Sequence, residues 1–461
     1  MMGIVVSVMI LLCALLFGYL SRQNVVDPKP IWWTALVYVV IYGVIPVLLL
    51  FLYKDIGPRF YWFNVVEYDR GISPYSSFLV ILSYICISLS YVYGPNVSGS
   101  GVIRGINKTY SRISLRSWFV FAFITQLASL YFLKLYTSQR GASLYVLLQN
   151  AGRLRNGESI VGVNDASWTF LSYATCSIFA SAVISAIYSE VRSYKTSDNI
   201  KTGLFISMLI SIGITLLILW LKAGRLHLFN FIVLIFIILT RRVRWQTRLI
   251  FAILGFALGY LILTSGKSLF GVQTSNDNVT YFSKIADAAS EFGFPVMSLE
   301  LTTHSVNILW RFFIDYALAP IYVFGLPISA FVFGFVPELQ ESVAKINTVA
   351  FLGTYSSGEI PVDIVTLGYY NMGVIGVVIT SLIFGFAMKS INSVFSEHNN
   401  PIVSAVKYMI IIYFISVGIM YADPVNFLRD SFYIWMPLLV IAIGSPTLKS
   451  RRNIVDVGKS R

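Results

Sequence analysis

The stretch from Gly266-Lys267-Ser268 to Pro361-Val362-Asp363, about residues 266–365, is of mixed polarity. The rest of the chain is a series of apolar runs. Nine of the chain's 21 acidic residues and one of its three histidines lie in this stretch. Apolar runs precede and follow it. The side of a membrane on which this stretch lies therefore decides both the fold and where chemistry can occur.

Composition places the chain among membrane proteins. A soluble domain carries about 25% charged residues, whereas this chain of 461 residues is 57% hydrophobic and 12% charged, with a mean hydropathy of +0.75. Apolar runs of roughly 20 residues can cross a bilayer as helices. The sequence predicts an all-α polytopic membrane protein with eleven spans, at 3–20, 32–53, 77–93, 117–136, 167–189, 203–221, 226–240, 249–265, 366–388, 401–420 and 432–447.

The distribution of lysine and arginine determines how one further apolar run, 317–336, is interpreted. With eleven spans, the loops of one side carry 20 basic and five acidic residues, and the other side carries 14 basic and 16 acidic residues. Cytoplasmic loops are enriched in Lys and Arg, so the stretch 266–365 is assigned to the outside. A crossing at 317–336 would move the basic C-terminal tail outside. We therefore expect a broken or in-plane helix there, interrupted by Pro320 and Pro327, with a twelfth span as the alternative.

This topology divides the chain into three parts. Residues 1–265 hold the first eight spans, 266–365 form the large outer loop, and 366–461 hold the last three spans and a basic cytoplasmic tail.

Several classes of function are disfavoured by the same sequence. Cys13, Cys86 and Cys176 lie inside apolar runs, so they form neither a disulfide framework nor a metal-binding spacing. The net charge of +13 is explained by the cytoplasmic loops, and no nucleic-acid partner is expected. There is no P-loop or dinucleotide-binding motif, and no cofactor is predicted. The spans contain almost no ionisable groups, which disfavours an ion-coupled transporter.

Basic residues on the predicted outer side need a reason, because the positive-inside bias disfavours them there. They form four groups, namely Arg153 with Arg155, the tight turn from Lys222 to Arg225, Arg311 in the outer loop, and Arg429. A guanidinium presents a planar set of donors that suits phosphate oxygens. Convergence of these groups would suit a lipid-linked pyrophosphate. Pairing with local acids, such as Asp430 beside Arg429, or with lipid headgroups is the alternative.

Candidate catalytic residues lie in the outer loop. Glu300, His304 and Arg311 would share one face if residues 295–313 formed a helix, which would place a base beside an anion clamp. The alternative is an amphipathic helix lying on the membrane. No third ligand accompanies Glu300 and His304, so no metal site is expected.

Four more candidates follow at the end of the loop. Glu359 and Asp363 are candidates for acceptor-sugar contacts or for a base. Tyr369 and Tyr370 could stack on a sugar ring, although tyrosines at this position are more typical of an aromatic membrane belt.

Taken together, these features resemble the O-antigen polymerases, the Wzy-type oligosaccharide repeat-unit polymerases. The likeness covers most of the chain and lies in topology more than in sequence. The shared features are the large outer loop in the second half, the basic turn 222–225, Arg153 and Arg155 before a mid-chain span, the glycine-rich aromatic entry 368–373, Arg429 before the last span, and the proline-broken segment 321–337.

The resemblance implies a GT-C-like glycosyltransferase of the bacterial inner membrane with its active site facing the periplasm. Such an enzyme transfers a growing glycan from undecaprenyl pyrophosphate to a new lipid-linked repeat unit. It works in the membrane lipid alongside a chain-length regulator and a flippase of the same pathway. The pyrophosphate is a built-in leaving group, so no nucleotide site is required. An O-antigen ligase and a lipid-linked oligosaccharide flippase or other transporter are the alternatives.

Overall fold

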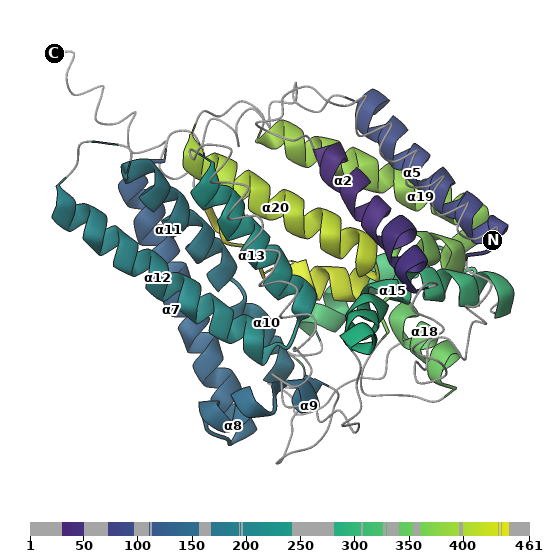
Figure 1. Ribbon diagram of the computed structural model, residues 1–461, viewed down its shortest axis with the longest axis horizontal. Helices are drawn as coiled ribbons and strands as arrows, with labels where there is room; N and C mark the ends of the chain where they lie inside the picture. The colour runs from purple at the N-terminus through teal and green to yellow at the C-terminus, as the bar shows by residue number, and fades with distance from the viewer. Residues whose placement is uncertain are drawn as a thin grey trace.

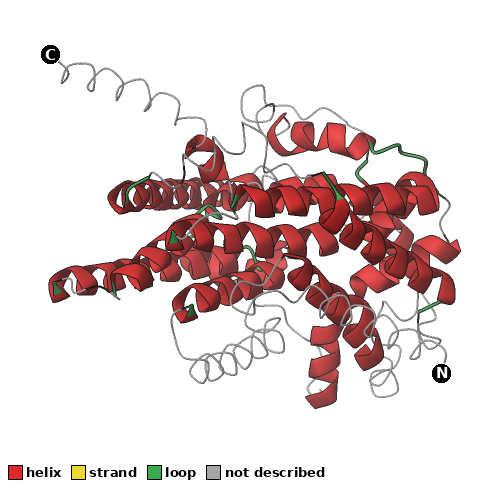
Figure 2. Cartoon of the chain, turned by 90° about the horizontal axis from the view of Figure 1, so that it is seen from above, coloured by secondary structure: helices red, strands yellow, loops and turns green. Residues whose placement is uncertain are grey.

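The structure, a computed structural model, describes residues 30–49, 72–95, 110, 113–155, 167–192, 194, 197–241, 281–305, 308–325, 329, 341–353, 360–395, 400–431, 433–434 and 436–441. Within these residues every regular element is a helix and no strand occurs (Figure 2). The prediction of an all-α protein is therefore confirmed for the described part of the chain.

Figure 1 shows the helices packed side by side. Their bounds are α2 (Pro30–Tyr38), η1 (Val39–Val44), α5 (Pro74–Tyr93), α7 (Leu115–Arg140), α8 (Leu144–Gln149), α9 (Ala151–Arg155), α10 (Ser167–Ala174), α11 (Ser177–Val191), α12 (Asp198–Leu221), α13 (Arg225–Thr240), α15 (Tyr281–Ser305), α16 (Ile314–Pro320), η5 (Ile321–Gly325), α18 (Val343–Leu352), α19 (Ile364–Val394) and α20 (Pro401–Met420).

Seven of the described helical segments are long and apolar enough to cross a membrane, and each coincides with a predicted span. They are Pro30–Leu49, Pro74–Tyr93, Leu115–Arg140, Trp168–Val191, Asp198–Leu221, Ile364–Val394 and Pro401–Met420. The predicted span 226–240 forms the shorter apolar helix Leu226–Thr240. The predicted spans 3–20 and 249–265 lie outside the described residues, and 432–447 is described only in part. The chain is thus a polytopic membrane protein, and the count of eleven stays a prediction.

The helix ends gather into two opposite sets. At one end, Ala422 N at the close of α20 donates to Val362 O just before α19. We call this the long-loop end, because residues 141–155, 222–224, 341–353 and 421–431 also meet there, and α8, α9 and α18 lie along the lower edge of Figure 1. At the opposite end, Lys389 Nζ of α19 donates to Gly94 O after α5, at 2.5 Å. This grouping is the one expected from the predicted loops, while the compartment that each end faces stays a prediction.

The contacts of Arg311 bear on the segment 317–336. Arg311 Nη2 donates to Glu341 O at 2.7 Å, which joins the chain before this segment to the chain after it. A single crossing between the two residues would separate them by roughly 30 Å of hydrocarbon. The hydrogen bond therefore supports the expectation that 317–336 does not cross the membrane once. The described part of the segment lies in α16 and η5, which together form the short apolar helix Ile314–Gly325.

Small residues allow the spans to pack closely. Without a hydrophobic driving force in lipid, helix association depends on close approach and on interhelical hydrogen bonds. A Cβ atom on Gly385 of α19 would lie 2.4 Å from Ile87 O of α5, so only glycine permits this contact. Beside it, Ser83 Oγ and Ser381 Oγ are 2.7 Å apart, and Ser83 Oγ also lies 2.8 Å from Tyr38 OH.

A kink in α19 shapes the entry that follows the long loop. Gly373 adopts φ +60° and ψ −140°, a conformation that other residues rarely reach, and this interrupts the helix after Met372. Leu309 N donates to Tyr370 O at 3.0 Å, and the side chain of Ile308 covers Gly373. The kink thus creates the place where the segment beginning at Ile308 docks against α19.

Candidate functional site

Basic side chains surround Asp430 at the long-loop end. Lys222 Nζ lies 2.8 Å from Asp430 Oδ1, and His227 Nε2 lies 3.5 Å from Asp430 Oδ2. Arg429 Nε lies 3.8 Å from Asp430 Oδ1, and its guanidinium also donates to Asn426 Oδ1. One carboxylate therefore faces two permanent cations and a histidine. We call Lys222, His227, Arg429 and Asp430 the basic cluster.

The local sequence explains how the two halves of the basic cluster are positioned. On one side, Ala223 adopts a left-handed conformation with φ +48°, which reverses the chain between α12 and α13. On the other side, Asp423 caps the helix that begins at residue 424, because Asp423 Oδ1 accepts from the backbone N–H groups of Val425 and Asn426. Asp423 Oδ2 accepts in addition from Ala344 N at the start of α18.

Burial makes this cluster electrostatically strong. The side chains of Lys222 and Asp430 are each 11% exposed, and that of His227 is 7% exposed. Burial alone would raise the pKa of the Asp430 carboxyl. The nearby charges and hydrogen bonds of Lys222, His227 and Arg429 outweigh burial and hold this pKa well below its usual value. Asp430 is therefore ionised at neutral pH.

The helix that carries Arg153 packs against the same turn. Ala151 of α9 and Ala223 of the turn are both buried and pack with Trp220. Trp220 Nε1 also donates to Leu148 O of α8, at 3.4 Å. Arg153 itself is exposed. The structure therefore brings together the elements that carry three of the four predicted basic groups.

Two members of those groups can be placed only by their backbones. Arg225 begins α13 and Arg155 ends α9, and the side chains of both lie outside the described residues.

Glu300 and His304 form a second candidate site, near the end of α15. Glu300 is buried and its Oε1 accepts from Ser73 N at 2.7 Å, while its Oε2 lies 3.4 Å from His304 Nδ1. The His304 side chain is 57% exposed. Burial raises the pKa of the Glu300 carboxyl, although the hydrogen bonds from Ser73 and Ser76 and the neighbouring His304 lower it in part. A buried carboxylate beside an exposed imidazole can orient that ring and stabilise its charged form.

Arg311 does not belong to this site. The shared face required one helix over 295–313, and this condition is not met, because α15 stops at Ser305 and Arg311 lies in a separate segment. Arg311 is buried and pairs with Asp315 through two hydrogen bonds, at 2.8 Å and 2.7 Å. Together with the bond to Glu341 O, this pairing occupies the guanidinium within the fold. Asp315 lies four residues after Arg311 in the sequence, and this spacing indicates the pairing.

Asp363, a predicted acceptor-sugar contact, is fully buried and caps α19. Its Oδ1 accepts from Val365 N, Thr366 N and Tyr42 OH, and its Oδ2 accepts from Thr366 Oγ1. Every oxygen of this carboxyl therefore has a partner inside the protein. The other acidic candidate of this region, Glu359, lies outside the described residues.

The two predicted sugar-stacking tyrosines have different surroundings. Tyr370 is fully buried and its OH donates to Asn347 Oδ1 at 3.2 Å, so its ring has no free face. Tyr369 is half-buried and meets Tyr75 edge to face, with ring centroids 6.2 Å apart. Tyr75 lies between Ser73 and Ser76, the two residues of α5 and its cap that contact α15. Tyr369 thus lies at the junction of α5 and α19.

Arg140 was not among the predicted candidates. It lies in the last turn of α7, is 2% exposed, and stacks over the rings of Tyr136 and Trp168 at 5.6 Å and 5.4 Å. Its Nε and Nη2 atoms are buried without a hydrogen-bond partner. Cation–π contacts of this kind hold a guanidinium between aromatic rings. The feature of the sequence that could have identified Arg140 is an arginine at the end of an apolar span on the predicted outer side.

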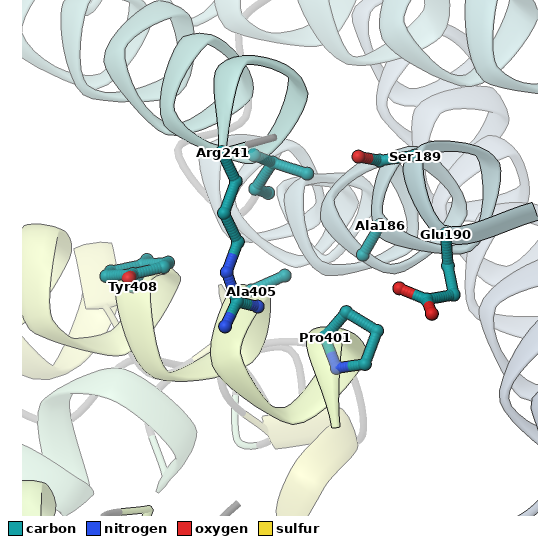
Figure 3. Close-up of a pocket in the computed structure, with 8 residues that line it drawn as sticks. Ala186, Ser189, Glu190, Arg241, Pro401, Ala405 and Tyr408 are labelled. Carbon is teal, nitrogen blue, oxygen red and sulfur yellow. The ribbon is translucent and has the colours of Figure 1, made fainter. Parts of the chain in front are cut away.

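A small cavity lies at the opposite end of the molecule. Glu190, Arg241, Pro401 and Tyr408 line it, as Figure 3 shows, and its volume of about 10 Å³ has room for roughly one water molecule. None of the predicted site residues lines this cavity.

The described residues contain no group of three His, Cys, Asp or Glu side chains that could hold a metal ion. Comparison of the chain with protein-family models, with curated proteins and with solved structures found no match.

Proposed function

We propose that the protein is a membrane glycosyltransferase that polymerises undecaprenyl-pyrophosphate-linked oligosaccharide repeat units, as O-antigen polymerases do, at the periplasmic face of the bacterial inner membrane. The observation that carries this proposal is the basic cluster at the long-loop end with the Arg153 helix beside it. Lys222, His227 and Arg429 converge on Asp430. The cluster therefore gathers two permanent cations and a histidine at one end of a membrane protein.

Basic side chains gathered in this way suit a pyrophosphate leaving group. When the bond between the glycan and the pyrophosphate breaks, negative charge develops on the phosphate oxygens, and fixed cations stabilise that charge. Arg153 is exposed on the helix beside the cluster, where a guanidinium suits the phosphate oxygens of an incoming lipid. Asp430 holds Lys222 in place before the substrate arrives, which reduces the ordering cost of binding.

The Glu300–His304 pair supplies the base in this proposal. His304 would accept the proton of the attacking sugar hydroxyl, and the Glu300 carboxylate would stabilise the imidazolium that forms. The pair requires no cofactor, and its imidazole is open to solvent while its carboxylate is not. Half-buried Tyr369 offers a ring for the acceptor sugar.

Arg153→Ala and Arg225→Ala test the basic site. Each removes a charged donor worth about 1.5–3 kcal/mol in a hydrogen bond to an anion, so polymerisation should slow by about one to two orders of magnitude. Cells carrying either variant should display single repeat units in place of long chains on a polysaccharide gel. Arg116→Ala is the matched control, since Arg116 is exposed at the other end of α7. Unchanged ladders in both variants would contradict the proposal, and long chains that stay on the undecaprenyl carrier would favour a ligase.

His304→Ala tests the base. General-base catalysis contributes at least about a hundredfold, so turnover of lipid-linked repeat units should fall by that factor while their binding changes little. His304→Gln keeps much of the volume and should be equally slow. If activity in a reconstituted assay with lipid-linked substrate survives both changes, another residue must take the proton.

A further inference from the structure

The segment from Ile308 to Gly325 is backbone-strained and carries exposed aromatic residues. Trp310, Phe312 and Phe313 have φ values of +50°, +49° and +61°, in the left-handed region that non-glycine residues seldom adopt. Trp310 is 53% exposed and Phe312 is 65% exposed, and their ring centroids are 6.0 Å apart. Strain of this kind persists only where surrounding contacts enforce it.

Hydrogen bonds on both sides of the strained turn provide these contacts. Arg311 is bound to Asp315 by two hydrogen bonds and to Glu341 O by a third. On the other side of the turn, Phe313 N donates to Asn371 Oδ1 at 2.7 Å. The turn is therefore bonded to α16 through the side chain of Arg311 and to α19 through the backbone of Phe313. The result is that two large aromatic side chains are held outward and not folded onto the protein.

The helix that follows has an apolar outer face. Asp315, Ala319 and Val323, at i, i+4 and i+8, are buried against the protein. The exposed residues on the remaining arc are all uncharged and mostly apolar, namely Ile314, Tyr316, Ala317, Pro320 and Ile321. A helix whose outer face contacts water normally carries its charged residues there. This one, at about 18 Å, is also too short to cross roughly 30 Å of hydrocarbon.

The apolar face continues onto a membrane span. Asn371 of α19 binds the strained turn, and Ile375, one turn further along α19, is 60% exposed. The outer surface of a span meets lipid, so the exposed face of residues 310–321 borders a lipid-facing surface. Tryptophan and other aromatic side chains prefer the boundary between headgroups and hydrocarbon. From these observations we propose that Trp310, Phe312 and the outer face of α16 and η5 form an interfacial anchor, which inserts into the outer part of the bilayer next to α19.

In this arrangement Arg311 is a positioning residue for the anchor. It directs the aromatic side chains toward lipid and fixes the start of α16 against the chain at Glu341. The anchor would hold this part of the long loop at the membrane surface. The inference rests on exposure, strain and pairing, and it stands whether or not the chain transfers glycans.

Nitroxide labels on the full-length chain in lipid nanodiscs test the anchor. Trp310→Cys and Phe312→Cys carry the label in a background where Cys13, Cys86 and Cys176 are serine, and gel filtration checks that each variant folds. Power-saturation EPR then compares accessibility to oxygen, which partitions into lipid, with accessibility to a water-soluble nickel chelate. Lys345→Cys on α18 is the aqueous control, since its side chain is 46% exposed at the same end, and Ile375→Cys is the lipid reference.

The expected result is that labels at 310 and 312 are several-fold more accessible to oxygen than to nickel, as at 375, with the reverse at 345. Labels at 310 and 312 that match the aqueous control would overturn the proposal. Low accessibility to both reagents would mean that protein, such as a second copy of the chain, covers the face, and this too would overturn it. Arg311→Gln should increase the mobility of the label at 312 and leave the label at 345 unchanged.

Discussion

Asp430→Asn should lower the free energy of unfolding by about 3–5 kcal/mol, because it removes the carboxylate that the buried ammonium group of Lys222 faces. Lys222 Nζ is 2.8 Å from this carboxylate, and both side chains are only 11% exposed. His227 loses its acidic partner in the same step. The measurement is thermal unfolding of the purified protein in detergent, followed by intrinsic fluorescence.

Asp198→Asn is the matched control for Asp430→Asn. Asp198 also faces a lysine, Lys201, at 3.8 Å, but its side chain is 98% exposed. Exposed pairs of this kind contribute about 0–1 kcal/mol, so the control should unfold near the wild-type temperature. Lys222→Met combined with Asp430→Asn should recover part of the loss, since both buried charges are then gone. Equal unfolding temperatures for Asp430→Asn and Asp198→Asn would show that Asp430 does not compensate the positive charge of the cluster.

Asp363→Ala should lower the free energy of unfolding by about 3–7 kcal/mol, for a different reason. The carboxyl caps α19, and loss of a cap costs about 1 kcal/mol. The variant also leaves the buried hydroxyls of Tyr42 and Thr366 without an acceptor, at roughly 1–3 kcal/mol each. Asp363→Asn keeps an oxygen for Tyr42 OH and the two backbone N–H groups, and its NH2 group can donate to the Thr366 hydroxyl. It should therefore cost less than about 1 kcal/mol. An unfolding temperature of Asp363→Asn as low as that of Asp363→Ala would contradict this account.

The two carboxyls should respond to pH with opposite signs. Burial raises the pKa of Asp363 above its usual value of 3.8, despite hydrogen bonds from Thr366 and Tyr42 that lower it. Its protonated form therefore stabilises the fold, fully below pH 3.8, and this contribution is lost as the pH rises through the folded-state pKa. The pKa of Asp430 is held well below 3.8. Its contribution is fully present above pH 3.8 and is lost as the pH falls below that value.

Much of the fold follows from local sequence. Seven predicted spans appear as apolar helices, because an apolar run of the right length can satisfy its backbone in lipid only as a helix. The predicted ends are less accurate, since Ile364–Val394 extends six residues beyond the predicted span 366–388. The turn Lys222–Arg225 falls between two spans, and Asp430 next to Arg429 was recognised as a possible pairing partner.

The pairings between distant segments could not be predicted. Lys222 binds Asp430 across 208 residues, and the identity of that partner depends on which helices pack together. Asp363 lies at the end of the outer loop, which suggests a contact with substrate. The same position, just before a span, also fits a helix cap. The sequence contains the capping pattern, but burial of Asp363 by Tyr42 arises only from tertiary packing. Arg140 was missed because its aromatic partner Trp168 lies beyond a long connection.

The contact between α5 and α19 has a consequence for how the protein is made. Ser83 and Ser381, which bind each other across this contact, are 298 residues apart in the chain. At about 5–20 residues per second, a ribosome needs roughly 15–60 s to synthesise the intervening chain. During that interval α5 lacks the helix that covers the surface around Ile87 in the finished protein. Whatever occupies that surface must leave before Gly385 can approach. Biogenesis of this protein therefore includes a late lateral docking step, and a cell that slows or truncates translation would accumulate the first half of the molecule with α5 not yet covered by α19.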